Sequence, residues 1–415
     1  MQEMKSKPSL ELADIFRQHA KNYVENHGPT SVQQRRVLKA IQLCRTAALG
    51  GHVEECDDCG HREISYNSCR NGHCPKCQAA ARAKWLDARK KELLPVEYFH
   101  VVFTLAEEFR LIALQNKKTV YGILFRAAAQ TLSQVAENPK HLGAKIGFFG
   151  ILHTWGQNLF HHPHVHFVVP GGGLSTDKTK WISAPRGFFL PLAVLKLVFR
   201  GKFIDLLKRA YAKGELDFHG DVAKLSDRKA FEAHLDKAAK HEWVIHVKPP
   251  FGGPEQVLKY LARYTHRVAI SNQRLVSMKD GKVTFKWKDY ASGNQKKFMT
   301  ISVVELIRRF LLHVMPLRFI RIRYYGFLSS RNRKQSLELC QKLLAKLADA
   351  LPYENVETHD SSGSQELESP DLPATQNQRK KCPACKKGSM VIIINLLPIP
   401  HWRRRAPIPE LVDTS

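Results

Sequence analysis

Hydrophobic side chains recur along the chain at two spacings, which predict where helices and strands lie. A spacing of three to four residues predicts a helix over residues 9–26 and a second one from Ser31 to Gly50. Apolar runs and alternating patterns predict strands at 98–105, 148–157, 164–169, 243–248, 274–278, 282–288 and 318–325. Further helices are expected before Pro139, mainly over 188–240, and at 255–267, 302–313 and 336–351.

Local turn and cap signals refine this pattern. Asp280-Gly281 is a good turn pair between two predicted strands, so these strands form a hairpin. Ser302 and Glu305 have the spacing of a capping box at a helix start. Hairpins and helices in this order predict an α+β fold, with a mainly antiparallel sheet flanked by helices and an N-terminal helical and zinc-binding module.

Composition divides the chain further. Residues 354–371 carry six acidic residues and no Lys or Arg, and they are rich in Ser, so we expect a flexible linker. The expected segments are 1–51 (helical), 52–94 (zinc-binding module), 95–330 (main domain, with a helical insertion at about 188–240), 331–352 (helix), 353–380 (acidic linker) and 381–415 (tail with half a zinc knuckle).

The chain is strongly basic. Its 65 Lys and Arg against 38 Asp and Glu give a net charge of +27, while 43% hydrophobic residues fit a globular chain. Such a surplus favours a polyanionic partner, with nucleic acid first and an anionic membrane second, although charge spread for solubility gives the same total. We expect no membrane span, because the apolar run 390–400 is too short, and no secretion, because the N-terminus lacks an apolar core.

Six of the nine cysteines form three C-x-x-C pairs, a spacing typical of zinc sites in a cytosolic protein. We expect one tetrahedral structural zinc on two of these pairs, Cys56/Cys59 and Cys74/Cys77. Cys382 and Cys385 form half of another knuckle, which would need His401 or partners from the N-terminal module. Other candidate ligands are Cys69, His73, His52 and His61.

Residues 161–169 (HHPHVHFVV) form a histidine cluster. Since alternate residues of a strand share a face, His164 and His166 point the same way and can hold one metal ion. A third ligand is expected from the preceding strand, either Gln157, which we favour slightly, or His153.

Two tyrosines stand four residues apart in the predicted helix 255–267. On a helical wheel Tyr260 and Tyr264 lie off the apolar stripe and share their face with arginines. A phosphate group suits this combination of hydroxyl and guanidinium groups. Arg263, His266 and Arg267 are therefore candidate phosphate contacts.

These motifs, in this order, resemble the HUH single-strand endonucleases and, more narrowly, the insertion-sequence 91 family of rolling-circle transposases. His164-Val165-His166 matches the HUH motif, Tyr260 and Tyr264 match the two-tyrosine motif, and the cysteine module matches the zinc-binding region. The stretches 162–173, 248–272 and 321–328 also resemble this family, and the resemblance covers roughly residues 10–330.

The resemblance implies that residues 95–330 are a transposase catalytic domain that cleaves single-stranded DNA of transposon ends and targets. Tyr260 or Tyr264 would attack a phosphodiester, giving a 5′-phosphotyrosine link and a 3′-OH, with Mg²⁺ or Mn²⁺ at the histidines and structural Zn²⁺ at the cysteines. No nucleotide cofactor is expected, because the bond energy is kept in the link and the sequence has no P-loop motif. Such a protein would be cytoplasmic and associated with the bacterial nucleoid.

Two other functions remain open at this point. A non-catalytic zinc-ribbon DNA-binding regulator fits the charge and the cysteines but leaves the histidines without a role. The pattern His162-x-His164-x-His166 also resembles the histidine-triad nucleotide hydrolases, although that fold needs neither zinc knuckles nor a basic surplus.

Overall fold

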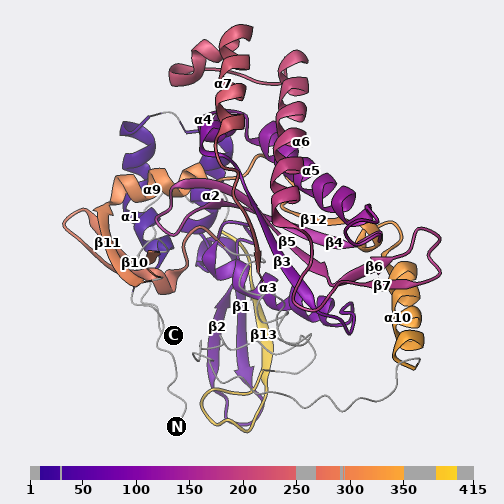
Figure 1. Cartoon of the computed structure of the whole chain (residues 1–415). Helices are drawn as coiled ribbons and strands as arrows, with labels where there is room; N and C mark the ends of the chain where they lie inside the picture. Colours follow the sequence, from indigo (N-terminus) through magenta and orange to yellow (C-terminus); the bar gives the residue numbers. More distant parts are fainter. Residues whose placement is uncertain are drawn as a thin grey trace.

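The computed structural model describes residues 10–28, 30–248, 268–289, 293, 295–349 and 380–399. These residues form helices and antiparallel sheets (Figure 1), which confirms the predicted α+β class. Within the described part of the chain, no helix combines the length and apolar character that crossing a bilayer requires.

A five-stranded antiparallel sheet occupies the centre of the molecule, in the order β12-β4-β5-β3-β8 (Figure 1). Its strands are β3 (Tyr98–Thr104), β4 (Phe148–Trp155), β5 (His161–Pro170), β8 (Ile245–Lys248) and β12 (Ile322–Tyr325). The central strand β5 pairs with β3 on one side and with β4 on the other. This pairing places segments far apart in the sequence next to the predicted histidine strand.

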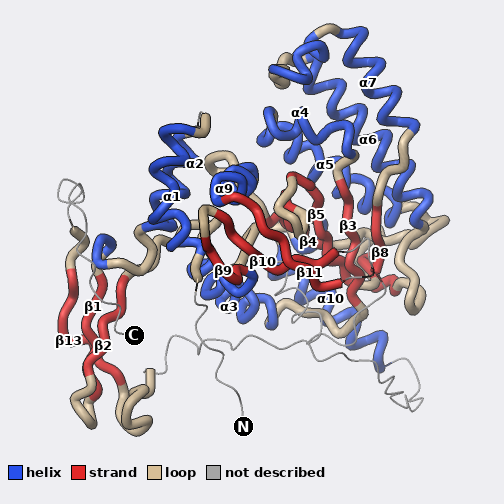
Figure 2. Tube along the Cα trace, turned by 90° about the vertical axis from the view of Figure 1, so that its left-hand side faces the viewer, coloured by secondary structure: helices blue, strands red, loops and turns tan. Residues whose placement is uncertain are grey.

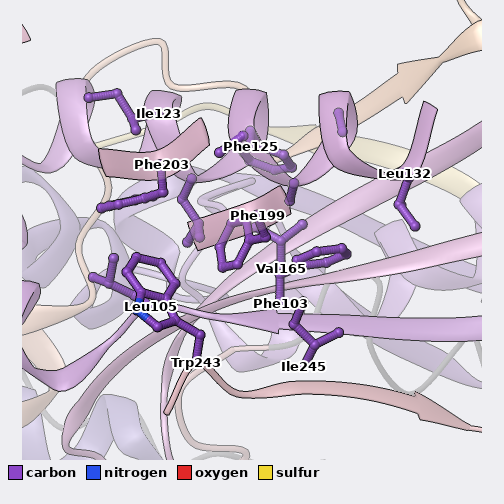
Figure 3. Packing of buried hydrophobic residues seen from close by; sticks show 14 of the residues in the cluster. Phe103, Leu105, Ile123, Phe125, Leu132, Val165, Phe199, Phe203, Trp243 and Ile245 are labelled. Atoms are coloured by element: carbon purple, nitrogen blue, oxygen red, sulfur yellow. The ribbon is translucent and has the colours of Figure 1, made fainter. Parts of the chain in front are cut away.

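One face of this sheet carries the main hydrophobic core. The helices α4 (Arg110–Gln115), α5 (Lys117–Glu137), α6 (Leu192–Ala212) and α7 (Arg228–Lys240) form the layer on this side. Val165 and Phe167, alternate residues of β5, are fully buried in it. Figure 3 shows Val165 and Phe103 of the sheet beside Phe199 of α6, whose ring centroid lies 4.9 Å from that of Phe103. Because strand residues alternate between faces, His164 and His166 point to the opposite side.

That opposite face is partly covered by α3 (Pro75–Lys90) and α10 (Arg333–Asp349). These helices pack around Phe149, Ile151 and Val168, in a second hydrophobic cluster that includes Leu86 and Leu337. His166 lies directly opposite Ile151, and the pair His153 and His164 comes next along the same face. The covering helices thus leave one end of the face for the site.

A smaller antiparallel sheet packs with the two N-terminal helices and with the helix that follows it in the chain. Its strands are β9 (Leu275–Lys279), β10 (Lys282–Asp289) and β11 (Gln295–Ser302), in the order β11-β10-β9. They share a core with α1 (Leu12–Asn26), α2 (Val32–Gln42) and α9 (Val303–Leu312). The side chain of Ser302 accepts a hydrogen bond of 3.2 Å from the Glu305 backbone N–H and so caps α9, as its spacing predicts.

A third sheet of three strands, in the order β13-β1-β2, carries cysteines and projects from the rest of the molecule (Figure 2). Its strands are β1 (Gly51–Cys56), β2 (Arg62–Tyr66) and β13 (Met390–Leu396). A short ribbon of β6 (Gly172–Leu174) and β7 (Trp181–Ser183) follows β5, and 3₁₀ helices lie at Ala47–Leu49, Glu107–Phe109, Gly220–Ser226, Asn272–Arg274 and Gly326–Leu328.

Most predicted strands and helices are present with ends shifted by a few residues. The segment 188–240 is mainly helical, as predicted, and consists of two helices separated by a 3₁₀ helix. The sequence patterns missed β1, β2, β11, β13 and α3. For β1, β2 and β13 the reason is that short strands in a small metal-site sheet bury few apolar residues and give weak alternation. The predicted helix 255–267 lies outside the described residues.

Candidate metal centres and nucleic-acid interface

His153, His164 and His166 lie side by side on the sheet face opposite the main core. His153 of β4 is directly opposed to His164 of β5, and His166 is the next residue of β5 on that face. One ligand nitrogen from each residue lies within 4.8 Å of the others. His153 and His166 are buried, whereas His164 is half-exposed, so the cluster meets solvent at His164. Three converging imidazoles of this kind can hold one divalent ion and leave positions open for a substrate.

Two neighbouring groups orient these rings. His164 Nδ1 lies 2.6 Å from the His162 carbonyl oxygen, so its N–H donates there and Nε2 remains for a metal. His166 Nδ1 lies 2.8 Å from Nε2 of His100 on β3, and the two rings are stacked. Burial, helped by the nearby Lys248 and His164, lowers the pKa of His100 to about 3. His100 is therefore neutral at pH 7 and able to accept a hydrogen bond.

Two side chains from α9 and its C-terminal cap hold the turn that joins the two metal-site strands. The His313 ring lies 3.0 Å from the Leu159 carbonyl oxygen through Nε2, and Arg309 donates to the Asn158 carbonyl at 2.9 Å. Burial is the main cause that lowers the pKa of His313 to about 4, so the ring stays neutral near pH 7. These contacts fix the relative position of β4 and β5, and hence of their histidines.

Gln157, the favoured third ligand, lies in this turn and not in the strand. β4 ends at Trp155, so the strand alternation used to predict Gln157 does not reach it, and its carbonyl accepts a hydrogen bond from Arg274. His153, the alternative ligand, lies beside His164 and His166. Gln157 stays a prediction, while the geometry favours His153.

The predicted nucleophiles Tyr260 and Tyr264, together with Arg263, His266 and Arg267, lie outside the described residues. In the sequence, the described residues on either side of them are Lys248 and Val268. Lys248 lies opposite His100 in the β3–β8 register.

The cysteines form two clusters, and Cys382 and Cys385 lie with cysteines of the N-terminal module, one of the two alternatives that the sequence left open. Cys74 and Cys77 lie with two other thiols at the start of α3, in the group Cys44, Cys69, Cys74 and Cys77. Cys56 and Cys59 lie with thiols from the other end of the chain, in the group Cys56, Cys59, Cys382 and Cys385. The prediction that Cys56, Cys59, Cys74 and Cys77 surround one ion is therefore wrong, because the hairpin β1–β2 carries the first knuckle away from the second.

The first cluster includes one ligand that sequence reasoning missed. Cys44 has no C-x-x-C partner, and only the tertiary structure brings its sulfur to 3.6 Å from those of Cys74 and Cys77. Cys69, a candidate extra ligand, joins the same cluster, 3.6 Å from Cys77. His52 and His73 lie in neither cluster of the described residues: His52 contacts Glu54, and His73 accepts from the Met315 backbone.

The outer face of the β10–β11 hairpin is basic and carries an exposed aromatic ring. Phe298 is 65% exposed and directly opposite Lys286. Two pairs further along, and therefore on the same face, two lysines, Lys288 and Lys296, are opposed. Like charges in that position repel, and an anion lying between them would relieve the repulsion. A ring among lysines on one strand face is a feature of single-stranded nucleic-acid platforms.

Comparisons with known proteins agree with these features. A family described as "Putative transposase" matches residues 147–336, and one described as "Transposase zinc-binding domain" matches residues 15–105. A Sinorhizobium fredii protein named "Putative transposase y4qJ" is 55% identical over 383 residues, covering 92% of this chain and 94% of its own. The "Transposase for insertion sequence element IS801" of Pseudomonas savastanoi pv. phaseolicola is 28% identical over 335 residues, covering 79% and 76%.

No solved structure matches the chain significantly. The sequence matches join a zinc-binding region to a transposase region in the order that the motifs predict. The protein thus belongs to the insertion-sequence 91 family of transposases.

Proposed function

We propose that this transposase cleaves and rejoins single-stranded DNA through a tyrosine, with a divalent ion held by His153, His164 and His166. The observation that carries the proposal is the convergence of these three imidazoles, with ligand atoms within 4.8 Å, on one face of the sheet, where His164 is accessible to solvent. The same sequence supplies two candidate nucleophiles in Tyr260 and Tyr264. Mg²⁺ is the more abundant cellular ion, whereas imidazole ligands favour Mn²⁺.

When bound, the ion would polarise the scissile phosphate as a Lewis acid. The protein itself would supply the nucleophile, a tyrosine. A tyrosine hydroxyl gives up its proton, and its oxygen bonds to phosphorus while the bond from phosphorus to the 3′ oxygen breaks. That oxygen takes a proton and leaves as a 3′-OH, and the 5′ end stays on the tyrosine. Attack by a 3′-OH on this link reverses the step and rejoins a strand.

Single-stranded DNA also suits the surface of the small sheet. Phe298 offers a ring for base stacking, and the lysines around it, Lys286, Lys288 and Lys296, offer charge for the phosphates. The net charge of +27 favours the same partner. This activity would place the protein in the cytoplasm, and residues 95–330 would be its catalytic domain.

The test is covalent capture of a single-stranded oligonucleotide that carries the element end. With Mg²⁺ or Mn²⁺ the parent should form a protein–DNA adduct, and mass spectrometry should place the DNA on Tyr260 or Tyr264. The double variant Tyr260→Phe, Tyr264→Phe should form none, and each single variant serves as its matched control. Equal capture by the double variant would refute the proposal. Salt-sensitive DNA binding with no cleavage in either metal would favour a non-catalytic regulator instead.

A further inference from the structure

The C-terminal segment 380–399 lies against the N-terminal cysteine hairpin. Its strand β13 pairs antiparallel with β1, from Gly51 opposite Leu396 to Cys56 opposite Met390 (Figures 1 and 2). The knuckle of Cys382 and Cys385 precedes this strand, so the pairing carries it to Cys56 and Cys59. Cys59 and Cys382 are 323 residues apart in the sequence, and their sulfurs are 3.7 Å apart.

The spacing of these sulfurs fits one tetrahedral ion. Cys56 and Cys385 are also 3.7 Å apart, and all four sulfurs lie within 4.8 Å of one another. Thiolates at roughly 2.3 Å from one zinc ion should be about 3.8 Å apart. A disulfide would need about 2.05 Å, and all nine cysteines are thiols.

The two knuckles share a backbone conformation. The residue after each second cysteine is left-handed, with φ 71° at Gly60 and φ 59° at Lys386. Backbone N–H groups then point at sulfur: Cys59 donates to Cys56 at 3.5 Å, and Gly388 donates to Cys385 at 3.4 Å. Such donors stabilise a thiolate, the form that binds metal.

The two knuckles are in close contact. A Cβ on Gly388 would lie 2.4 Å from the Cys56 sulfur, so no larger residue fits without displacing the thiol. Asp57 accepts from the Ser389 N–H at 2.7 Å, and its own N–H donates to the Ser389 carbonyl at 3.1 Å. The C-terminal knuckle is thus held against the N-terminal one by hydrogen bonds as well as by contacts between sulfur atoms.

This segment buries too little apolar surface to be held in place by packing alone. The buried cluster here consists of Cys56, Cys382 and Met390, with Cys385 packed against it. The side chains of β13 beyond Met390 are largely exposed, among them Ile392 at 53% and Ile394 at 52%. A segment with so little buried surface needs another source of stability, and a bound metal can supply it.

We infer that Cys56, Cys59, Cys382 and Cys385 bind a second structural zinc ion, separate from the ion expected at Cys44, Cys69, Cys74 and Cys77, and that this ion ties the two ends of the chain together. Only half of the site falls within residues 15–105, the zinc-binding region matched by the family. The second half comes from the far end of the chain and completes the fold of the β1–β2 hairpin.

Zinc content of the full-length protein tests the inference. Elemental analysis should find two zinc ions per chain in the parent and one in the double variant Cys382→Ser, Cys385→Ser. Cys340→Ala, which removes a buried cysteine of α10 outside both clusters, should retain two. One ion in the parent, or two in the double variant, would overturn the inference.

A second measurement does not depend on zinc counting. A protease site inserted within residues 354–371 would allow the full-length protein to be cut after folding. On gel filtration the C-terminal fragment should stay with the body of the parent and of Cys340→Ala, and should separate in the Cys382→Ser, Cys385→Ser variant. A fragment that stays bound in that variant would show that zinc does not tie the ends. Neither measurement involves DNA cleavage, so failure here leaves the proposed function untouched.

Discussion

Replacement of His100 by Leu should weaken binding of the catalytic metal without removing a ligand. If His166 binds the ion through Nε2, its Nδ1 carries a proton and donates it to Nε2 of His100, 2.8 Å away. His100 and His166 are only 1% and 7% exposed, so water does not readily replace the lost acceptor. A buried donor left without a partner costs about 1–3 kcal/mol, equal to roughly 5- to 150-fold in affinity. Loss of such outer contacts at metal sites typically costs about 10- to 100-fold, which is the expected effect.

Manganese titration followed by electron paramagnetic resonance measures this affinity directly, because free Mn²⁺ gives the signal. His100→Gln is the matched control, since its amide oxygen can accept near the former Nε2 position and should recover most of the affinity. Thermal unfolding should show that both variants remain folded. The reasoning fails if folded His100→Leu binds Mn²⁺ as tightly as the parent, or if His100→Gln is weakened as much as His100→Leu.

Three further outcomes follow from the structure. Phe298→Ala should weaken binding of a single-stranded oligonucleotide by about 1–3 kcal/mol through loss of base stacking, and fluorescence anisotropy showing an unchanged Kd would argue against that platform. His313→Gln should flatten the pH dependence of stability. The pKa of His313 is about 4 in the folded protein and about 6.5 in the unfolded chain, so as pH falls the proton binds mainly to the unfolded state. The parent should therefore lose about 2 kcal/mol of folding free energy from this group between pH 7 and pH 5, measured by urea titration. Phe103→Ala, at a fully buried position of β3, should lower the free energy of unfolding by about 3–5 kcal/mol, and a loss below 1 kcal/mol would contradict the packing in Figure 3.

The sequence predicted the parts of this protein whose signals are local. β5 could be read from alternation, because Val165 and Phe167 enter the core while His164 and His166 do not. The cap of α9 and the hairpin turn at Asp280-Gly281 were confirmed for the same reason, since each depends on a few adjacent residues. The family motifs are also local, and the comparisons confirm the family that they indicated.

Errors arose where a site is assembled across the chain. Equal C-x-x-C spacings suggested that Cys56/Cys59 and Cys74/Cys77 share an ion, but spacing carries no information on which pairs meet. Cys44 gave no signal, because it belongs to no C-x-x-C pair and its partners lie 25 or more residues away in the sequence. The choice between Gln157 and His153 also depends on tertiary structure, because it turns on where β4 ends, at Trp155.

The sequence alone determined the class of fold, the family, the histidine strand and the presence of thiol knuckles, because these depend on residue order and short-range periodicity. Tertiary structure alone decided which ligands converge: β-sheet register brings His153 to His164, and the return of β13 to β1 brings Cys382 to Cys59. The physical reason is that contacts between distant segments are set by sheet pairing and core packing, which sum over many weak interactions and leave little trace at any one position.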